Sequence, residues 1–156
     1  MSPIVKISLG AAVCIGVFLI SLPSLVHRAG LHPEYSGPTV DLPGKRALII
    51  TTSHSVLASV GETEGDPTGV AISEMTHPYY TFLDGGMDVD LASTKGGQIP
   101  IDPMTMNRVA KTVQDERFLN DSIAMSKARH SIPIADVDIT AYDIVFISGG
   151  WAHHTT

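Results

Sequence analysis

The chain has 156 residues, of which 44% are hydrophobic and 17% are charged. This is the length of one domain and the composition of a globular protein, which excludes a fully disordered chain, a collagen and a coiled coil. The formal net charge is -6 and the basic residues are scattered, so no nucleic-acid partner is expected. A single cysteine, Cys14, excludes a disulfide scaffold and a cysteine-only zinc site.

An uncharged apolar run covers residues 7–26, between Lys6 and Arg28. A helix of that length reaches about 30 Å, the thickness of a bilayer hydrocarbon core. We therefore expect residues 1–28 to be an uncleaved membrane anchor with one transmembrane helix, and the protein to be membrane-anchored. A cleaved export signal is the alternative, although the flank HRAG is a poor cleavage site. A buried core helix is the third interpretation, but such a helix is rarely apolar on every face.

Residues 29–44 contain three prolines and three glycines without an apolar period, which predicts an extended linker. The folded domain is then expected over residues 45–156. Cys14 lies in the apolar run, where thiolate formation is disfavoured, so it is not a candidate nucleophile.

The first elements of this domain predict a strand, a helix and a second strand. Residues 46–52 form a short apolar run rich in β-branched side chains, typical of a buried strand. A helix is expected over residues 68–83, capped by Asp66 or Thr68 and kinked or ended at Pro78. Residues 87–94 alternate apolar and polar side chains, which indicates a strand parallel to the first.

The second half of the domain has weaker patterns. Residues 95–104 are expected to be loop, and helical segments are expected over residues 105–111 and 115–128. Residues 131–142 read as a connection, and residues 142–148 as a third strand. This strand ends in Gly149 and Gly150, at the kind of carboxyl-end loop where α/β proteins place their sites.

The polar residues suggest few conventional sites. The seven histidines form no metal-binding pattern, and the adjacent His153 and His154 have no ligand partner at a suitable spacing, so neither a metal nor a cofactor is expected. Ser53 and Ser55 flank His54, but no Gly-x-Ser-x-Gly elbow accompanies them, which argues against a serine hydrolase.

Glu74 is the only charge between Val70 and Met75, in the helix close to the loop end of the predicted sheet. An exposed helix glutamate is the simpler interpretation. The alternative is a carboxyl group held in a cleft, where it would act as an acid, a base or a hydrogen-bond donor.

Several strings together resemble the ThiJ/PfpI superfamily, the class I glutamine amidotransferase-like fold, and within it the heat-shock chaperone and glyoxalase III subgroup. The resemblance runs from about Lys45 to Trp151. The strings that carry it are KRALIITT (45–52), PTGV (67–70) leading to Glu74, THPY (76–79), VDLAS (89–93), KGG (95–97), Asp115-Glu116 and YDIVFISGG (142–150).

The resemblance implies a flavodoxin-like parallel sheet sandwiched by helices. It also implies a cysteine at a strand-to-helix elbow, followed by a histidine and hydrogen-bonded to a glutamic acid of the first helix. Glu74 matches that glutamate, and Gly149 and Gly150 match the glycine pair whose backbone lines the site. The implied chemistry is the conversion of methylglyoxal to lactate without glutathione, through addition of the thiolate to the aldehyde. The resemblance also allows a homodimer.

The family's cysteine lies roughly thirty residues beyond the glycine pair, whereas this sequence stops six residues after Gly150. We therefore expect only the N-terminal part of the fold, truncated before the nucleophile, and an enzyme that is inactive as this fragment. Such a part leaves a sheet edge unpaired, which predicts aggregation or a need for a partner. The alternatives are a non-enzymatic chaperone of the holdase type and a decayed gene product.

Overall fold

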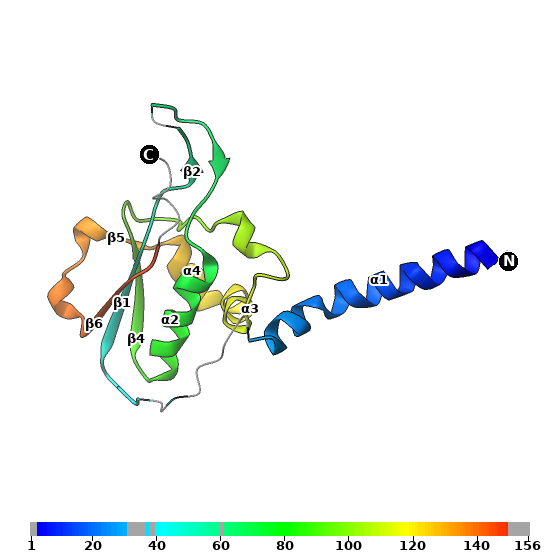
Figure 1. Cartoon of the computed structure of the whole chain (residues 1–156). Coiled ribbons are helices and arrows are strands. Elements are labelled where there is room, and N and C mark those ends of the chain that lie inside the picture. Colours follow the sequence, from blue (N-terminus) through cyan, green and yellow to red (C-terminus); the bar gives the residue numbers. More distant parts are fainter. Residues whose placement is uncertain (1–2, 31–36, 38–39, 60, 150–156) are drawn as a thin grey trace. The chain divides into compact units, whose positions relative to one another are not determined.

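A computed structural model of the chain describes residues 3–30, 37, 40–59 and 61–149. The chain divides into two compact units, one of residues 1–37 with 108–110 and the other of residues 38–107 with 111–156. The first unit contains helix α1 (Pro3–Arg28), and the second contains the sheet and the other helices (Figure 1).

The uncharged N-terminal run is helical, but the prediction of a transmembrane helix there is wrong. Helix α1 includes all of residues 7–26. Over the residues that the structure describes, no helix is long and apolar enough to cross a membrane. The prediction rested on the absence of charge, and absence of charge alone does not meet the combined length and apolarity that a bilayer core requires. The membrane-anchored localisation and the membrane partner that followed from it are likewise not supported.

The second unit is built on a four-stranded sheet in the order β5-β4-β1-β6, with every neighbouring pair parallel. Its strands are β1 (Arg46–Thr51), β4 (Asp88–Ser93), β5 (Ile132–Pro133) and β6 (Ile144–Ile147). The three strands expected from the sequence are confirmed, and so is the parallel pairing of the first two, with Ile49 opposite Leu91. The continuous apolar run predicts β1 well because Ala47, Leu48 and Ile49 are fully buried between other elements.

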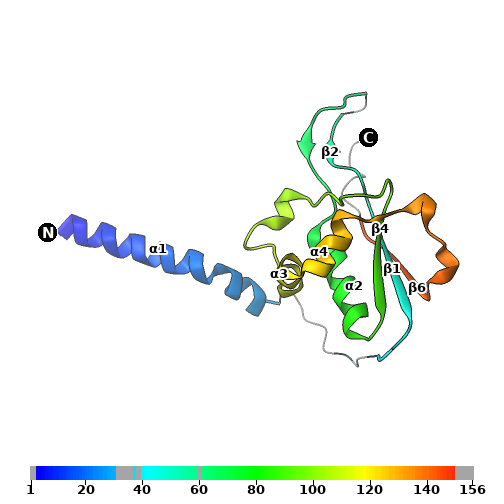
Figure 2. The ribbon, with the colours of Figure 1, turned by 180° about the vertical axis from the view of Figure 1, so that it is seen from behind.

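The helices α2 (Ile72–Asp84), α3 (Val113–Asn120) and α4 (Ser122–Arg129) lie on one side of the sheet in both views (Figures 1 and 2). Alternate side chains of the sheet point toward them. Ala47 and Ile49 of β1, with Val89 and Leu91 of β4, are at most 2% exposed. They form one apolar cluster with the inner residues of the helices and loops, namely Val70, Met75, Tyr79, Tyr80, Met87, Ile99, Phe118, Ala124 and Ala128.

The other side of the sheet carries the segment with the short 3₁₀ helices η2 (Ile134–Asp136) and η3 (Ile139–Ala141) (Figure 2). Asp90 points to this side because it lies between Val89 and Leu91. Its carboxylate accepts hydrogen bonds from Arg46 at 2.9 Å and from the Tyr142 hydroxyl at 3.1 Å. The Lys127 ammonium lies 3.4 Å from the other oxygen.

Asp90→Asn is expected to lower the free energy of unfolding by about 1 kcal/mol at neutral pH. Burial raises the pKa of Asp90, but the hydrogen bonds from Arg46 and Tyr142 and the charge of Lys127 outweigh burial and hold it below 3.8. A carboxyl whose pKa is lower in the folded state stabilises the fold above its unfolded pKa and loses that contribution as pH falls through the folded pKa. Urea titrations should therefore show a constant difference above about pH 5 that shrinks below about pH 4. A difference that grows on acidification would contradict this assignment.

Helix α2 begins at Ile72, four residues later than expected, because tertiary pairing holds the preceding segment extended. Val70 donates a backbone hydrogen bond to Pro100 at 2.9 Å, and Asp102 donates one back to Val70 at 3.0 Å. The predicted caps Asp66 and Thr68 are therefore not caps. Asp66 lies in β3 (Asp66–Pro67), which pairs antiparallel with β2 (Val56–Leu57).

The predicted helices of the second half are only partly confirmed. The first is reduced to the 3₁₀ helix η1 (Pro103–Met106), and the second is split at Asp121 into α3 and α4. The Asp121 carboxylate accepts hydrogen bonds from the backbone of Ile123 and Ala124, which starts a new helix. Pro78, expected to kink or end the first helix, lies inside α2, which continues to Asp84.

Candidate functional site

The strand order places a topological switch point between β1 and β6. The chain leaves β1 through α2 to reach β4 on one side, whereas β6 lies on the other side of β1. Open parallel sheets bind their ligands outside the carboxyl ends of the strands at such a point. The candidate site is therefore the region where β1 ends near Thr51 and β6 ends near Ile147.

Buried side-chain oxygens without hydrogen-bond partners occur at this end of the sheet. Over the described residues, buried oxygens without a partner include Thr68 Oγ1, Glu74 Oε2 and Ser148 Oγ. Thr68 and Glu74 lie on the path from β1 into α2, and Ser148 directly follows β6, so all three belong to the carboxyl end of the parallel strands. Each unmade hydrogen bond costs about 1–3 kcal/mol. A fold commonly retains such groups where a ligand or reactant supplies the partner.

Glu74 is held by the first turn of α2, the end of the helix that faces the switch point. Its backbone N–H donates to Ala71 at 3.0 Å, and the neighbouring Ile72 N–H donates to Thr105 Oγ1 at 3.2 Å. These contacts fix the backbone position from which the Glu74 side chain extends. With one carboxyl oxygen buried and unpaired, Glu74 can accept or donate a proton to a bound molecule.

The glycine pair predicted for the site is described only in its first member. Gly149 is exposed and has φ +135°, a conformation that other residues rarely adopt. The preceding Ser148 donates its backbone N–H to Ile50 at 2.8 Å, which ties the exit of β6 to β1. Gly150 lies outside the described residues. The structure thus puts Glu74 and Gly149 at the same end of the sheet.

The other residues considered from the sequence are the histidines and Cys14. Among the described residues no group of three histidine, cysteine, aspartate or glutamate side chains could hold a metal ion. His153 and His154 lie outside the described residues. Cys14 is exposed on α1, in the first unit.

Sequence reasoning missed Thr68 and Ser148 as members of the site. Both are about 4% exposed, and a hydroxyl residue carries no sign of its burial in the sequence. The one available signal was position, since each lies where the chain leaves or enters an element at the loop end of the sheet.

The fold is therefore that of an open parallel α/β sheet with its candidate site at the switch point. No family model matches the sequence, and no curated protein matches it. Solved structures do match. One is Rapid Encystment Protein 24 kDa of Francisella tularensis, at 34% identity and TM-score 0.59, with 67% of this chain and 44% of that chain covered.

Another is glyoxalase III from Candida albicans, at 24% identity and TM-score 0.58, with 69% of this chain and 44% of that one covered. A third crystal structure shares 28% identity at TM-score 0.51 and is covered over 43% of its length. The chain belongs to the ThiJ/PfpI superfamily, as its sequence motifs predict. It spans less than half the length of each of these structures.

Proposed function

We propose that this chain carries the acid–base side of a glyoxalase III-like site that acts on small aldehydes such as methylglyoxal. The observation that carries the proposal is the buried, unpaired Oε2 of Glu74 at the switch point of the sheet. The match to a glyoxalase III structure, at 24% identity, supports the fold on which this proposal rests.

The proposed chemistry needs a thiol and a base. A thiolate adds to the aldehyde carbon of methylglyoxal and forms a hemithioacetal. A base then removes the proton from that carbon and returns a proton to the neighbouring carbonyl carbon, which gives a thioester of lactate without any external oxidant. Water then releases lactate and the thiol. We assign the base to Glu74 and the lining of the developing oxyanion to the backbone at Gly149 and Gly150.

The thiol is not among the residues that the structure places at this site. The sequence has one cysteine, Cys14, and it belongs to the other unit. We therefore expect no lactate from methylglyoxal and the chain alone. An external thiol restores the missing reactant and allows Glu74 to be tested in the full chain as it exists.

The expected result is that the full chain accelerates the conversion of the hemithioacetal of dithiothreitol and methylglyoxal into its lactoyl thioester, followed by the ultraviolet absorbance of the thioester. Glu74→Gln should lower this rate at least about 100-fold, the scale of general acid–base catalysis. Glu64→Gln is the matched control, because Glu64 is an exposed carboxylate between β2 and β3. Equal rates for the Glu74→Gln variant and the unaltered chain would refute the proposal.

A non-enzymatic holdase is the second candidate, because β6 exposes apolar side chains on an open edge. Val145, Phe146 and Ile147 are 38%, 39% and 76% exposed. Within the described ranges β6 pairs with β1 alone. An unpaired apolar edge accepts extended segments of other chains. Suppression of client aggregation to the same extent by Glu74→Gln, with no thioester formed by either protein, would favour this function over the first.

A further inference from the structure

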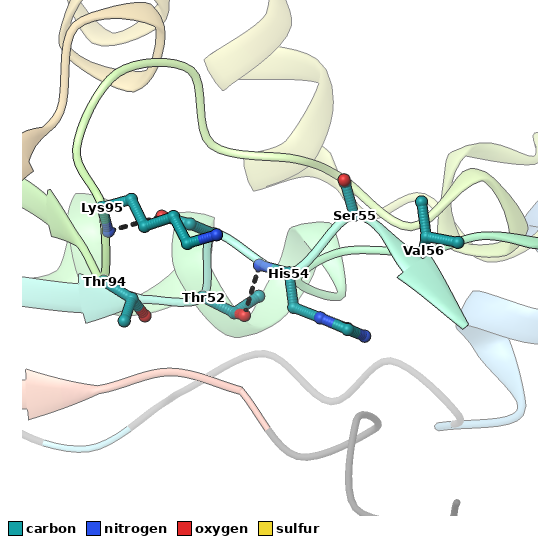
Figure 3. Close-up of a pocket in the computed structure, with 7 residues that line it drawn as sticks. Thr52, His54, Ser55, Val56, Thr94 and Lys95 are labelled. Carbon is teal, nitrogen blue, oxygen red and sulfur yellow. Dashed lines mark hydrogen bonds between the residues drawn. The ribbon is translucent and has the colours of Figure 1, made fainter. Parts of the chain in front are cut away.

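A cavity of about 290 Å³ lies between the loops that follow β1 and β4. Its lining comes from both loops: Thr52, Ser53, His54, Ser55, Val56, Thr94 and Lys95 (Figure 3). Glu74 is not among the lining residues, so the cavity is distinct in composition from the carboxyl group of the proposed function. A volume near 300 Å³ is at the lower end for small-molecule sites and suits a ligand of few heavy atoms.

The cavity holds basic side chains that lack acidic partners. Five other cations of this unit pair with carboxylates, in Lys45–Asp143, Arg46–Asp90, Lys111–Glu116, Arg117–Asp84 and Lys127–Asp90, whereas Arg129 on α4 has no such pair among the described residues. Lys95 forms no such pair within the part of the chain that the structure describes, and its side chain lies along the loop of Thr52 and His54 (Figure 3). No carboxylate lines the cavity. The wall is therefore cationic in a chain whose net charge is -6.

Hydrogen bonds join the two loops into one preformed wall. Ser53 Oγ accepts the backbone N–H of Lys95 at 2.8 Å and donates to Ser93 Oγ at 2.9 Å. Ser93 Oγ lies 2.8 Å from Ser131 Oγ, which donates to the Gly97 carbonyl oxygen at 2.6 Å. Ser93 and Ser131 are at most 4% exposed, so this chain of hydroxyls is shielded from water and holds the backbone of Lys95 in place.

A hydrogen bond also holds the backbone of the loop after β1. The backbone N–H of His54 donates to Thr52 Oγ1 at 2.8 Å (Figure 3). The exposed side chains of His54 and Lys95 thus extend from fixed backbone positions, so a bound ligand has to order these side chains but not the loops.

We infer that this cavity binds a small oxyanion, a carboxylate or phosphate group, through Lys95 and His54. The ammonium supplies the charge, the imidazole and the hydroxyls of Thr52 and Thr94 supply donors, and the carboxyl ends of two parallel strands are the usual place for such a ligand. The inference does not depend on the proposed function, since it involves neither Glu74 nor a thiol.

The test is a nuclear magnetic resonance titration of the full ¹⁵N-labelled chain with inorganic phosphate and, separately, with L-lactate at constant ionic strength. We expect saturable shifts of the backbone amides of Thr94, Lys95 and His54. Lys95→Gln should weaken the binding at least tenfold, which corresponds to about 1.4 kcal/mol. The side chain of Lys95 makes no ion pair with a described residue, so this variant should keep the fold.

Arg129→Gln is the matched control, because it removes one positive charge from an exposed position of α4 that does not line the cavity. It should bind as the unaltered chain does. Saturation by phosphate alone assigns a phosphate group, and saturation by lactate alone assigns a carboxylate. An absence of saturable shifts with either anion, or an equal loss in Arg129→Gln, would overturn the inference.

Discussion

Gly69→Ala should unfold the second unit at a much lower urea concentration than the unaltered chain, with a loss of about 3 kcal/mol or more. A Cβ atom at position 69 would lie 2.2 Å from the carbonyl oxygen of Pro100 and 2.7 Å from the nitrogen of Ile101. Both are backbone atoms, held by the hydrogen bonds that pair Val70 with this segment. No side-chain rotation can relieve the clash, so the pairing itself has to break.

Circular dichroism during a urea titration measures this loss. Gly16→Ala is the matched control, because a Cβ atom there meets nothing within 4 Å and the residue lies inside helix α1. The control should unfold as the unaltered chain does. A Gly69→Ala variant with the same urea midpoint as the control would show that the backbone of Pro100 and Ile101 does not lie this close to Gly69.

Asp115→Ala should cost about 3–4 kcal/mol of unfolding free energy, because it removes the acceptor that joins α3 to α2. One carboxylate oxygen of Asp115 accepts the Thr76 hydroxyl, and the other accepts the backbone N–H of Thr112 at 2.7 Å. Asp115 and Thr76 are both 0% exposed. The substitution leaves two buried donors unpaired, and one of them, the Thr112 N–H, loses the side-chain half of the capping box at the start of α3.

Glu116→Ala provides the comparison, since the neighbouring carboxylate is 55% exposed and its one ion pair within the described ranges is with Lys111. An exposed ion pair contributes at most about 1 kcal/mol. Asp115→Asn tests charge separately from shape, since it keeps one acceptor oxygen for the Thr76 hydroxyl. If Asp115→Ala and Glu116→Ala lower the urea midpoint equally, the buried contacts of Asp115 contribute nothing to the docking of α3.

The strands were the part of the fold that local pattern could predict. The segments at β1 and β4 carry apolar residues that the neighbouring strands and the helices bury, and that requirement is visible in the residues themselves. The apolar residues Val145, Phe146 and Ile147 of β6 also predict a strand, but they are exposed. Strand β5 was missed because its two residues, Ile132 and Pro133, have no pattern of their own. They become a strand only by pairing with Ala92 and Ser93.

Helix ends were predicted less well, for a related reason. The sequence around Pro67 and Thr68 suits a helix start, but the backbone there is taken by pairing with residues 100–102. At Asp121 the side chain competes for backbone donors and divides one expected helix into two. In the N-terminal run the helix itself is predicted correctly. The lack of charge there is not enough evidence for a membrane span, and the transmembrane prediction is wrong.

The candidate site residues also divide into those that the sequence points to and those that only the tertiary structure reveals. The sequence strings were enough to recognise the superfamily, and it was this resemblance that gave Glu74 a site role, since its local pattern alone favours an exposed helix glutamate. The sequence also shows that its one cysteine, Cys14, precedes residues 45–156.

Folding alone decided which groups are buried without partners and which loops meet. Thr68, Glu74 and Ser148 come to one end of the sheet because parallel strands share a carboxyl end, and Lys95 and His54 line one cavity because β4 pairs with β1. Burial and proximity arise between segments some 40 to 80 residues apart, and such interactions leave no local trace in a chain read in order.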